Sequence, residues 1–168
     1  MIRKNIILTI AALILTIVMF SQEAENNEIT NKSNELGMHA GFTTGLGLSF
    51  RHWENKYGIQ ITAIPIKTDY EQFISAAITG LYSFSKKKYT RFYLYLGNHV
   101  IIDDSYYNND TGLNETRTKY NIGFGTGFEV GKNVKFTVMA GYGAYDITSS
   151  SYMLLPTAEI GLYFKLRN

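Results

Sequence analysis

The last residues of the chain, TAEIGLYFKLRN (157–168), alternate strictly between two kinds of side chain. Every even-numbered residue from Ala158 to Leu166 is apolar, whereas the odd-numbered residues are polar, small or amphipathic. A side-chain period of two is typical of a β-strand with two different faces. This period recurs along most of the chain and therefore constrains the fold more than any other feature. It is found in seven segments: 37–53, 57–66, 73–85, 90–102, 116–130, 134–146 and 154–166.

The composition agrees with an all-β protein. The 168 residues include 13 Tyr, 10 Phe and 15 Gly but only 2 Pro. Aromatic residues favour strands, and no long helical period follows residue 21. The length is that of one domain rather than two.

The N-terminus has the layout of a secretory signal peptide. Basic residues precede an uncharged, mostly apolar run over residues 6–20, and a polar stretch begins at Ser21. The run is shorter than the roughly 20 residues that a membrane-spanning helix needs. We expect residues 1–21 to be removed, with cleavage after Ala24 and a retained N-terminal anchor as the alternatives.

Charge and cysteine content exclude several classes of protein. Loss of Arg3 and Lys4 with the signal peptide would leave equal numbers of acidic and basic residues, so no electrostatic footprint for nucleic acid remains. The absence of cysteine excludes disulfides and a lipid-modified N-terminal cysteine. Gly123, Gly125 and Gly127 line one face of a strand instead of forming a phosphate-binding loop, so no cofactor is predicted. Such glycines are expected to make room for large side chains.

The connections between the segments differ systematically in length. Residues 54–56, 85–89 and 131–133 form short connections, and these alternate with longer, more polar ones. Short turns at one end and longer loops at the other are typical of outer-membrane barrels. The longest connection, Asp103 to Glu115, is expected to be a solvated, mobile extracellular loop that could contact a ligand.

Large aromatic residues recur on the apolar face near the short-turn end. A ring of aromatic side chains at one level is typical of the interfacial girdle of a membrane barrel. The apolar face is therefore predicted to contact lipid. A soluble, lipocalin-like secreted binder with that face inside is the alternative. The predicted girdle consists of Phe50, Tyr57, Phe84, Phe92, Phe128, Phe136 and Phe164.

The C-terminal strand resembles the assembly signal of Gram-negative outer-membrane proteins. The polar, glycine and apolar positions of that signal are held here by Glu159, Gly161, Phe164 and Leu166. With the signal peptide and the strand pattern, the chain resembles the small barrels of the OmpA transmembrane-domain and OmpX type. The resemblance implies an eight-stranded, antiparallel up-and-down barrel over residues 37–168, with outer-membrane lipid and the barrel-assembly machinery as partners.

Seven segments do not make an even number of strands, which a bacterial barrel normally has. Either the N-terminal segment 22–36 supplies a short first strand, or one segment contains two strands.

The face opposite the apolar one contains many charged residues. Eight strands leave an interior just filled by side chains, so these residues are predicted to form a plug of ion pairs and hydrogen bonds. A narrow, anion-preferring conduit is the alternative. The predicted lumen network consists of Arg51, Arg91, Arg117, Lys119, Glu129, Lys135, Glu159 and Lys165.

The weak catalytic candidates are His99, Asp103 and Ser105, which are close together in the sequence. Some small outer-membrane barrels are lipid A acyltransferases or deacylases, and acyl transfer needs such groups. A metal site at His39 and His99 is less favoured, and no metal is predicted. The favoured hypothesis is a non-enzymatic outer-membrane barrel with a structural or surface-contact role.

Overall fold

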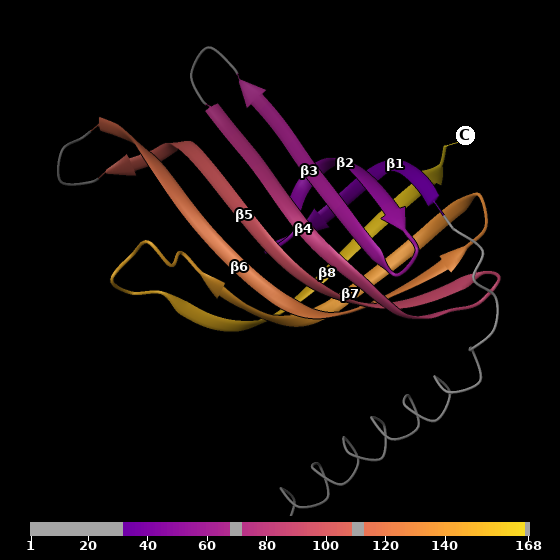
Figure 1. The fold of residues 1–168 in the computed structure, drawn as a ribbon. Helices are drawn as coiled ribbons and strands as arrows, with labels where there is room; N and C mark the ends of the chain where they lie inside the picture. The colour runs from indigo at the N-terminus through magenta and orange to yellow at the C-terminus, as the bar shows by residue number, and fades with distance from the viewer. Residues whose placement is uncertain (1–31, 68–71, 109–112, 167–168) are drawn as a thin grey trace, which may run out of the picture.

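The computed structural model describes residues 32–67, 72–108 and 113–166. The expected signal peptide and residues 22–31 lie outside the described residues. Eight strands follow one another within the described ranges (Figure 1), which contain no helix long and apolar enough to cross a membrane. The strands are β1 (Lys32–Gly41), β2 (Gly45–Glu54), β3 (Tyr57–Lys67), β4 (Gln72–Lys86), β5 (Thr90–Asn108), β6 (Leu113–Gly131), β7 (Val134–Tyr145) and β8 (Met153–Lys165).

The sheet closes on itself. Each strand pairs antiparallel with its neighbours in the chain, and β1 pairs with β8 from Glu35 opposite Lys165 to Ala40 opposite Ile160. Closure removes the exposed edges of the sheet and satisfies its main-chain hydrogen bonds internally. The predicted all-β, eight-stranded antiparallel barrel is confirmed.

The eighth strand arises because segment 37–53 contains two strands. β1 and β2 flank a turn at residues 42–44, and β1 begins at Lys32, so the barrel starts before the predicted boundary at Gly37. Gly41 pairs with Gly45, which has a φ of 89° that favours glycine. A turn with an odd number of residues keeps apolar residues at even positions on both sides. The alternation therefore continues through the turn and hides it.

The two ends of the barrel differ. Residues 55–56, 87–89 and 132–133 connect strands at one end, which also holds the start of β1 and the end of β8. We call this the turn end. The β3–β4 and β5–β6 hairpins reach away from the barrel body on the side opposite the C-terminus (Figure 1). Between Asp103 and Glu115, β5 continues to Asn108 and β6 begins at Leu113, so most of this segment is a strand ribbon and not a loop. Backbone pairing forms the ribbon without an apolar core, which is why its polar sequence suggested a loop.

The barrel is apolar outside and polar inside. Leu94 is 47% exposed, whereas its neighbour Tyr95 is 3% exposed. Buried polar residues greatly outnumber buried apolar ones. A water-soluble protein has a mostly apolar interior, whereas a polar interior and an apolar outer surface are typical of membrane barrels. Further outward apolar side chains include Leu36, Met38, Leu48, Ile61, Ile78, Leu96, Phe124, Val138, Ile160 and Leu162.

Candidate functional site

Five charged side chains from five strands meet inside the barrel near the turn end. They are Glu35 of β1, Arg51 of β2, Arg91 of β5, Glu129 of β6 and Lys135 of β7, and all are buried. We call them the charged cluster. They converge because each occupies an inward position of its strand at a similar height.

Hydrogen bonds hold the charged cluster together. Arg51 Nη1 donates to Glu129 Oε2 at 2.8 Å, and Lys135 Nζ donates to Glu129 Oε1 at 2.9 Å. Lys135 Nζ also donates to Glu35 Oε1 at 2.5 Å. Arg51 donates further to Gln60 Oε1, from Nε at 3.2 Å and from Nη2 at 2.7 Å. Buried charges are tolerated when they are paired and hydrogen-bonded in this way.

Aromatic rings fill the space around the two arginines. The Arg51 guanidinium carbon lies 3.9 Å from the ring centroid of Tyr163, and that of Arg91 lies 4.0 Å from Trp53. Trp53 and Tyr93 pack edge to face with their ring centroids 5.6 Å apart. These contacts are cation–π and aromatic pairs, which stabilise a desolvated guanidinium.

The β1–β2 turn folds into the barrel beyond the charged cluster. Thr43 and Thr44 are completely buried, and we call them the turn plug. Thr43 donates to Glu159 Oε1 from its backbone NH at 3.2 Å and from its hydroxyl at 2.5 Å. Thr44 donates its hydroxyl to Glu159 Oε2, and Thr157 donates to Oε1 at 3.1 Å. Glu159 of β8 therefore anchors the first turn.

His39 extends this network towards the charged cluster. Because the Thr44 hydroxyl donates to a carboxylate, the His39 Nε2–H donates to Thr44 Oγ1, at 2.6 Å. His39 Nδ1 then accepts from the hydroxyl of Tyr163 at 3.2 Å, and Tyr163 also contacts Ser49 Oγ at 3.0 Å. Tyr163 packs on Arg51 with its ring, so polar contacts run continuously through the interior.

His99 holds the turn plug from the other side. Its Nδ1–H donates to the Phe42 carbonyl oxygen at 2.8 Å, so its Nε2 accepts from Ser75 Oγ, also at 2.8 Å. Ser75 Oγ in turn accepts from the backbone NH of Leu46 at 3.0 Å. Asn121 also donates to the Phe42 carbonyl, at 3.0 Å. Both ends of the turn are thus fixed by side chains of β4, β5 and β6.

Three glycines make the space that the turn plug occupies. The register places Gly97, Gly123 and Gly143 side by side on β5, β6 and β7. A Cβ on Gly123 would lie 2.3 Å from Thr43 Oγ1, and one on Gly97 would lie 2.5 Å from the Thr43 carbonyl oxygen. A larger residue would displace the turn. Gly127 likewise makes space for Tyr93, because a Cβ on Gly127 would lie 2.2 Å from the Tyr93 ring.

The lumen residues predicted from sequence fall into two groups. Arg51, Arg91, Glu129, Lys135 and Glu159 lie inside the barrel. The remaining residues, Arg117, Lys119 and Lys165, are not part of the charged cluster. Arg117 lies near the end opposite the turn end, where it pairs with Asp146 at 2.9 Å and 44% of its side chain is exposed. Lys119 is half-buried, and Lys165 is exposed at the turn end. The alternation of a strand continues past the enclosed part of the barrel, so an inward position there is not buried.

Glu35 belongs to the charged cluster and was not predicted. It lies in segment 22–36, where alternation is weak, and the boundary at Gly37 excluded it. Its odd position places it on the same face as Gly37 and His39, and this parity was the only signal in the sequence that could have identified it.

Of the three weak catalytic candidates, His99 is engaged with the turn plug. His99 is 2% exposed and uses both ring nitrogens within the network described above. Asp103 is half-buried opposite Arg117, and the side chain of Ser105 lies outside the described part. Among the described residues, no group of three or more His, Cys, Asp or Glu side chains could hold a metal ion. His39 and His99 are each occupied by other partners.

The aromatic residues and two of the assembly residues, Phe164 and Leu166, lie on the outer face, whereas Glu159 and Gly161 are buried on the inner face. Phe50, Tyr57, Phe92, Phe136 and Phe164 are exposed, and Phe84 and Phe128 are half-buried. Phe92 contacts both of the latter, with ring centroids 6.3 Å from Phe84 and 4.7 Å from Phe128. In β8, Leu166 follows the strand and its NH donates to the Asn34 carbonyl oxygen at 2.8 Å, while Gly161 is buried opposite His39.

No protein-family model and no curated protein sequence matches the chain. Among solved structures, the N-terminal β-barrel domain of Pseudomonas aeruginosa OprF superposes with a TM-score of 0.53 at 14% identity, covering 80% of this chain and 96% of that one. The fold is that of a small outer-membrane β-barrel. Ail, the attachment invasion locus protein of Yersinia pestis, matches with a TM-score of 0.43 at 16% identity, covering 80% of this chain and 97% of its own.

Proposed function

We propose that this protein is a non-enzymatic integral outer-membrane barrel that strengthens the envelope and presents its long hairpins at the cell surface. The observation that carries this proposal is the arrangement of side chains, apolar outside and polar inside, around a closed barrel. The signal peptide expected at residues 1–21 and the assembly signal expected in β8 agree with export and insertion.

Contact with lipid explains the outer face. Large apolar residues are exposed on every strand, and monomeric water-soluble proteins rarely expose apolar surface on this scale. In a lipocalin-like binder the same side chains would line a ligand cavity, but here they point away from the interior. The aromatic residues near the turn end would then lie at the periplasmic interface of the outer membrane.

The filled interior favours a structural role over conduction. Arg51, Glu35 and the turn plug are each 0% exposed, and Glu159 is 1% exposed. Side chains from all sides therefore occupy the path along the barrel axis, in agreement with the small lumen of eight-stranded barrels.

The hairpins opposite the turn end are the proposed contact surface. β5 and β6 each have 19 residues, about twice the roughly 9–11 that a strand needs to cross a bilayer. Their ribbon would extend beyond the lipid and offer a surface for contact with a partner. The side chains of Tyr106 and Tyr107, which the sequence suggests for such a contact, lie outside the described part. The turn end would face the periplasm.

Protease accessibility tests this topology. A protease site inserted after Asn109 should be cut on intact cells and leave the barrel in the membrane, because the ribbon is extracellular. A matched site inserted after Lys132, in the β6–β7 turn, should be cut only once the outer membrane is permeabilised. The reverse pattern would refute the orientation, and release of the protein without detergent would refute the membrane barrel.

Reconstitution in planar bilayers tests the filled interior. The wild-type protein should show no sustained channel conductance. Glu159→Ala, which removes the anchor of the turn plug, should produce measurable openings. A stable open channel in the wild type would support the conduit alternative.

A further inference from the structure

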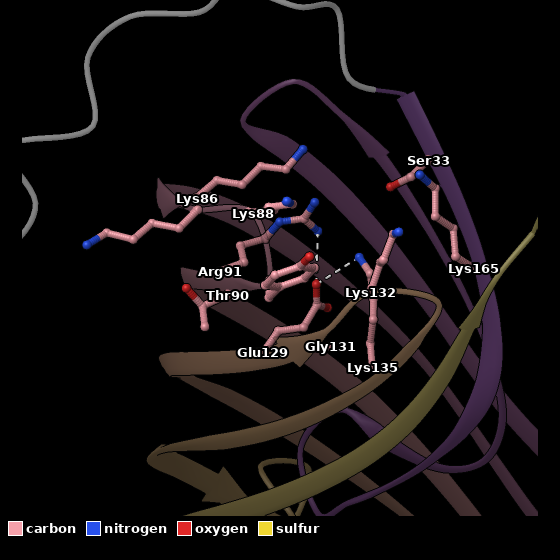
Figure 2. A pocket seen from close by; sticks show the side chains of 12 residues that line it. Ser33, Lys86, Lys88, Thr90, Arg91, Glu129, Gly131, Lys132, Lys135 and Lys165 are labelled. Carbon is pink, nitrogen blue, oxygen red and sulfur yellow. Dashed lines mark hydrogen bonds and ion pairs between the residues drawn. The ribbon is translucent and has the colours of Figure 1, made fainter.

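A cationic pocket of about 240 Å³ opens at the turn end (Figure 2). Six lysines and Arg91 line it, against one carboxylate, that of Glu129. Arg91 and Lys135 are buried, whereas Lys132 and Lys165 are exposed. The exposed run Lys86–Lys88 also lines the pocket. Its charge therefore favours an anion, which would pass the exposed lysines before it reached Arg91.

Arg91 is the unusual group in this pocket. Its side chain is 3% exposed, yet Nε and Nη1 have no hydrogen-bond partner among the described residues. One face of the guanidinium packs on Trp53, with 4.0 Å between the guanidinium carbon and the ring centroid. The N–H groups at the edge of the guanidinium point away from this ring and need acceptors from another group. A buried donor without an acceptor is costly, and native proteins contain few of them.

Three of the four carboxylate oxygens nearby already accept hydrogen bonds from other groups, and the fourth, Glu35 Oε2, has no hydrogen-bond partner among the described residues and lies 3.9 Å from Arg51 Nη1. Glu129 accepts from Arg51 and Lys135, and Glu35 accepts from Lys135. Arg91 Nη1 remains 3.6 Å from Glu129 and 3.9 Å from Glu35. Figure 2 shows Glu129 with Arg91 and Lys135 on the inner side of the pocket. The charged cluster has three cations and two carboxylates, so one further negative group would complete it.

We propose that this pocket binds a phosphate group, with Arg91 as the buried ligand and the exposed lysines guiding the group inward. The planar guanidinium presents donors that match the spacing of phosphate oxygens, and several converging cations can contact more than one of the oxygens over which a phosphate group spreads its negative charge. The pocket is smaller than the roughly 300–1,000 Å³ typical of sites for drug-sized ligands. It therefore fits a head group and not a large molecule.

The phosphate can come from a soluble periplasmic molecule or from the head group of a phospholipid in the inner leaflet. The two sources present the same chemistry to Arg91. They differ in whether binding requires a lipid, and the experiment below separates them.

Trp53 provides a built-in reporter of this site. It is the only tryptophan of the chain and contacts the Arg91 guanidinium directly. The full exported chain is prepared in an uncharged detergent, and inorganic phosphate is titrated at constant ionic strength against chloride. In a second arm, phosphatidylglycerol is added to the same micelles. A saturable change in Trp53 emission in the first arm assigns a soluble phosphate, and a change in the second arm alone assigns a lipid head group.

Three variants decide whether the change arises from this pocket. Arg91→Gln should weaken binding about tenfold or more, as expected for loss of hydrogen bonds to a charged group. The combined variant Lys87→Gln, Lys88→Gln, Lys132→Gln changes only exposed side chains and should weaken binding about three- to tenfold without disturbing the fold. Lys56→Gln removes an exposed charge at the same end but outside the pocket, and should bind like the wild type.

The outcomes are decisive even if Arg91→Gln does not fold, because the lysine variant and Lys56→Gln are compared with each other. Absence of saturable binding in both arms overturns the proposal. Equal binding by the lysine variant and Lys56→Gln also overturns it. Neither result would affect the proposed envelope role, which does not depend on this pocket.

Discussion

Arg51 of β2 and Glu129 of β6 form a buried ion pair across the barrel interior, with 2.8 Å between Nη1 and Oε2. Arg51→Met keeps much of the side-chain volume but removes the hydrogen bonds that Arg51 donates to Glu129 Oε2 and Gln60 Oε1, while Glu129 Oε1 keeps its bond from Lys135. We expect a loss of about 3–5 kcal/mol in the free energy of unfolding, as for other buried pairs that lose one partner. Urea unfolding in lipid vesicles, monitored by Trp53 fluorescence, measures this loss.

Lys32→Met is the matched control for that variant. Lys32 and Glu54 form an ion pair of the same length, 2.8 Å, but both side chains are more than half exposed. Water screens such a pair, so its loss should leave the unfolding midpoint unchanged within error. Equal destabilisation by the two variants would contradict a buried charged cluster.

Gly123→Ala tests the space that holds the turn plug. Its Cβ would overlap the Thr43 side chain, so we expect a destabilisation of about 1–3 kcal/mol, the usual cost of overpacking. Gly80→Ala is the control, because the nearest atom to its added Cβ is 4.0 Å away. Gly80→Ala should be neutral or slightly stabilising. Thermal unfolding of both variants, measured by gel mobility, distinguishes them.

Leu94 and Tyr95 report the two faces of β5. Leu94→Lys should lower the free energy of unfolding by about 2–4 kcal/mol if residue 94 lies near the bilayer midplane.

Fluorescent labels test the same assignment directly. Because the chain has no native cysteine, Leu94→Cys and Tyr95→Cys can each be labelled with a fluorophore while the protein is unfolded. After refolding, a lipid-soluble quencher should reach the label at 94 and not that at 95. Equal quenching would contradict contact of the apolar face with lipid.

Phe164 tests the proposed assembly signal. It is 52% exposed and lies opposite Leu36 of β1 and Val134 of β7. A charge here would face lipid at the seam of the barrel, so Phe164→Asp should be exported but degraded in the periplasm. Phe164→Leu keeps an apolar surface and should insert. Immunoblots of membrane and periplasmic fractions compare the two, and normal insertion of Phe164→Asp would refute the assignment.

The strand pattern was readable from sequence because an apolar outer face and a polar inner face impose a period of two. The strand number was less accessible, because the turn at residues 42–44 preserves parity between β1 and β2. The ribbon around Asp103 to Glu115 was also missed. Backbone hydrogen bonds form it, and these leave little trace in side-chain polarity.

Parity also indicated which residues of the site face inward, but it could not indicate which ones meet. Arg117 and Lys165 satisfy the pattern and still lie outside the charged cluster, because contact depends on the height of each residue in the barrel. That height follows from the register of neighbouring strands. The entry of Thr43 into the lumen had no signal of its own, because the pattern of Gly123, Gly125 and Gly127 predicted only that glycines make room for large side chains and not that a turn would occupy the space.

The hydrogen bond from the Thr43 hydroxyl to Glu159 joins residues 116 positions apart in the chain. A partly inserted chain that lacks β8 cannot provide this acceptor, so the first turn has no reason to enter the interior. We therefore expect the turn to be seated no earlier than the arrival of β8 beside β1. A barrel without β8 would have both an open seam beside β1 and an unfilled interior, so the last strand of the chain completes the wall and the plug together.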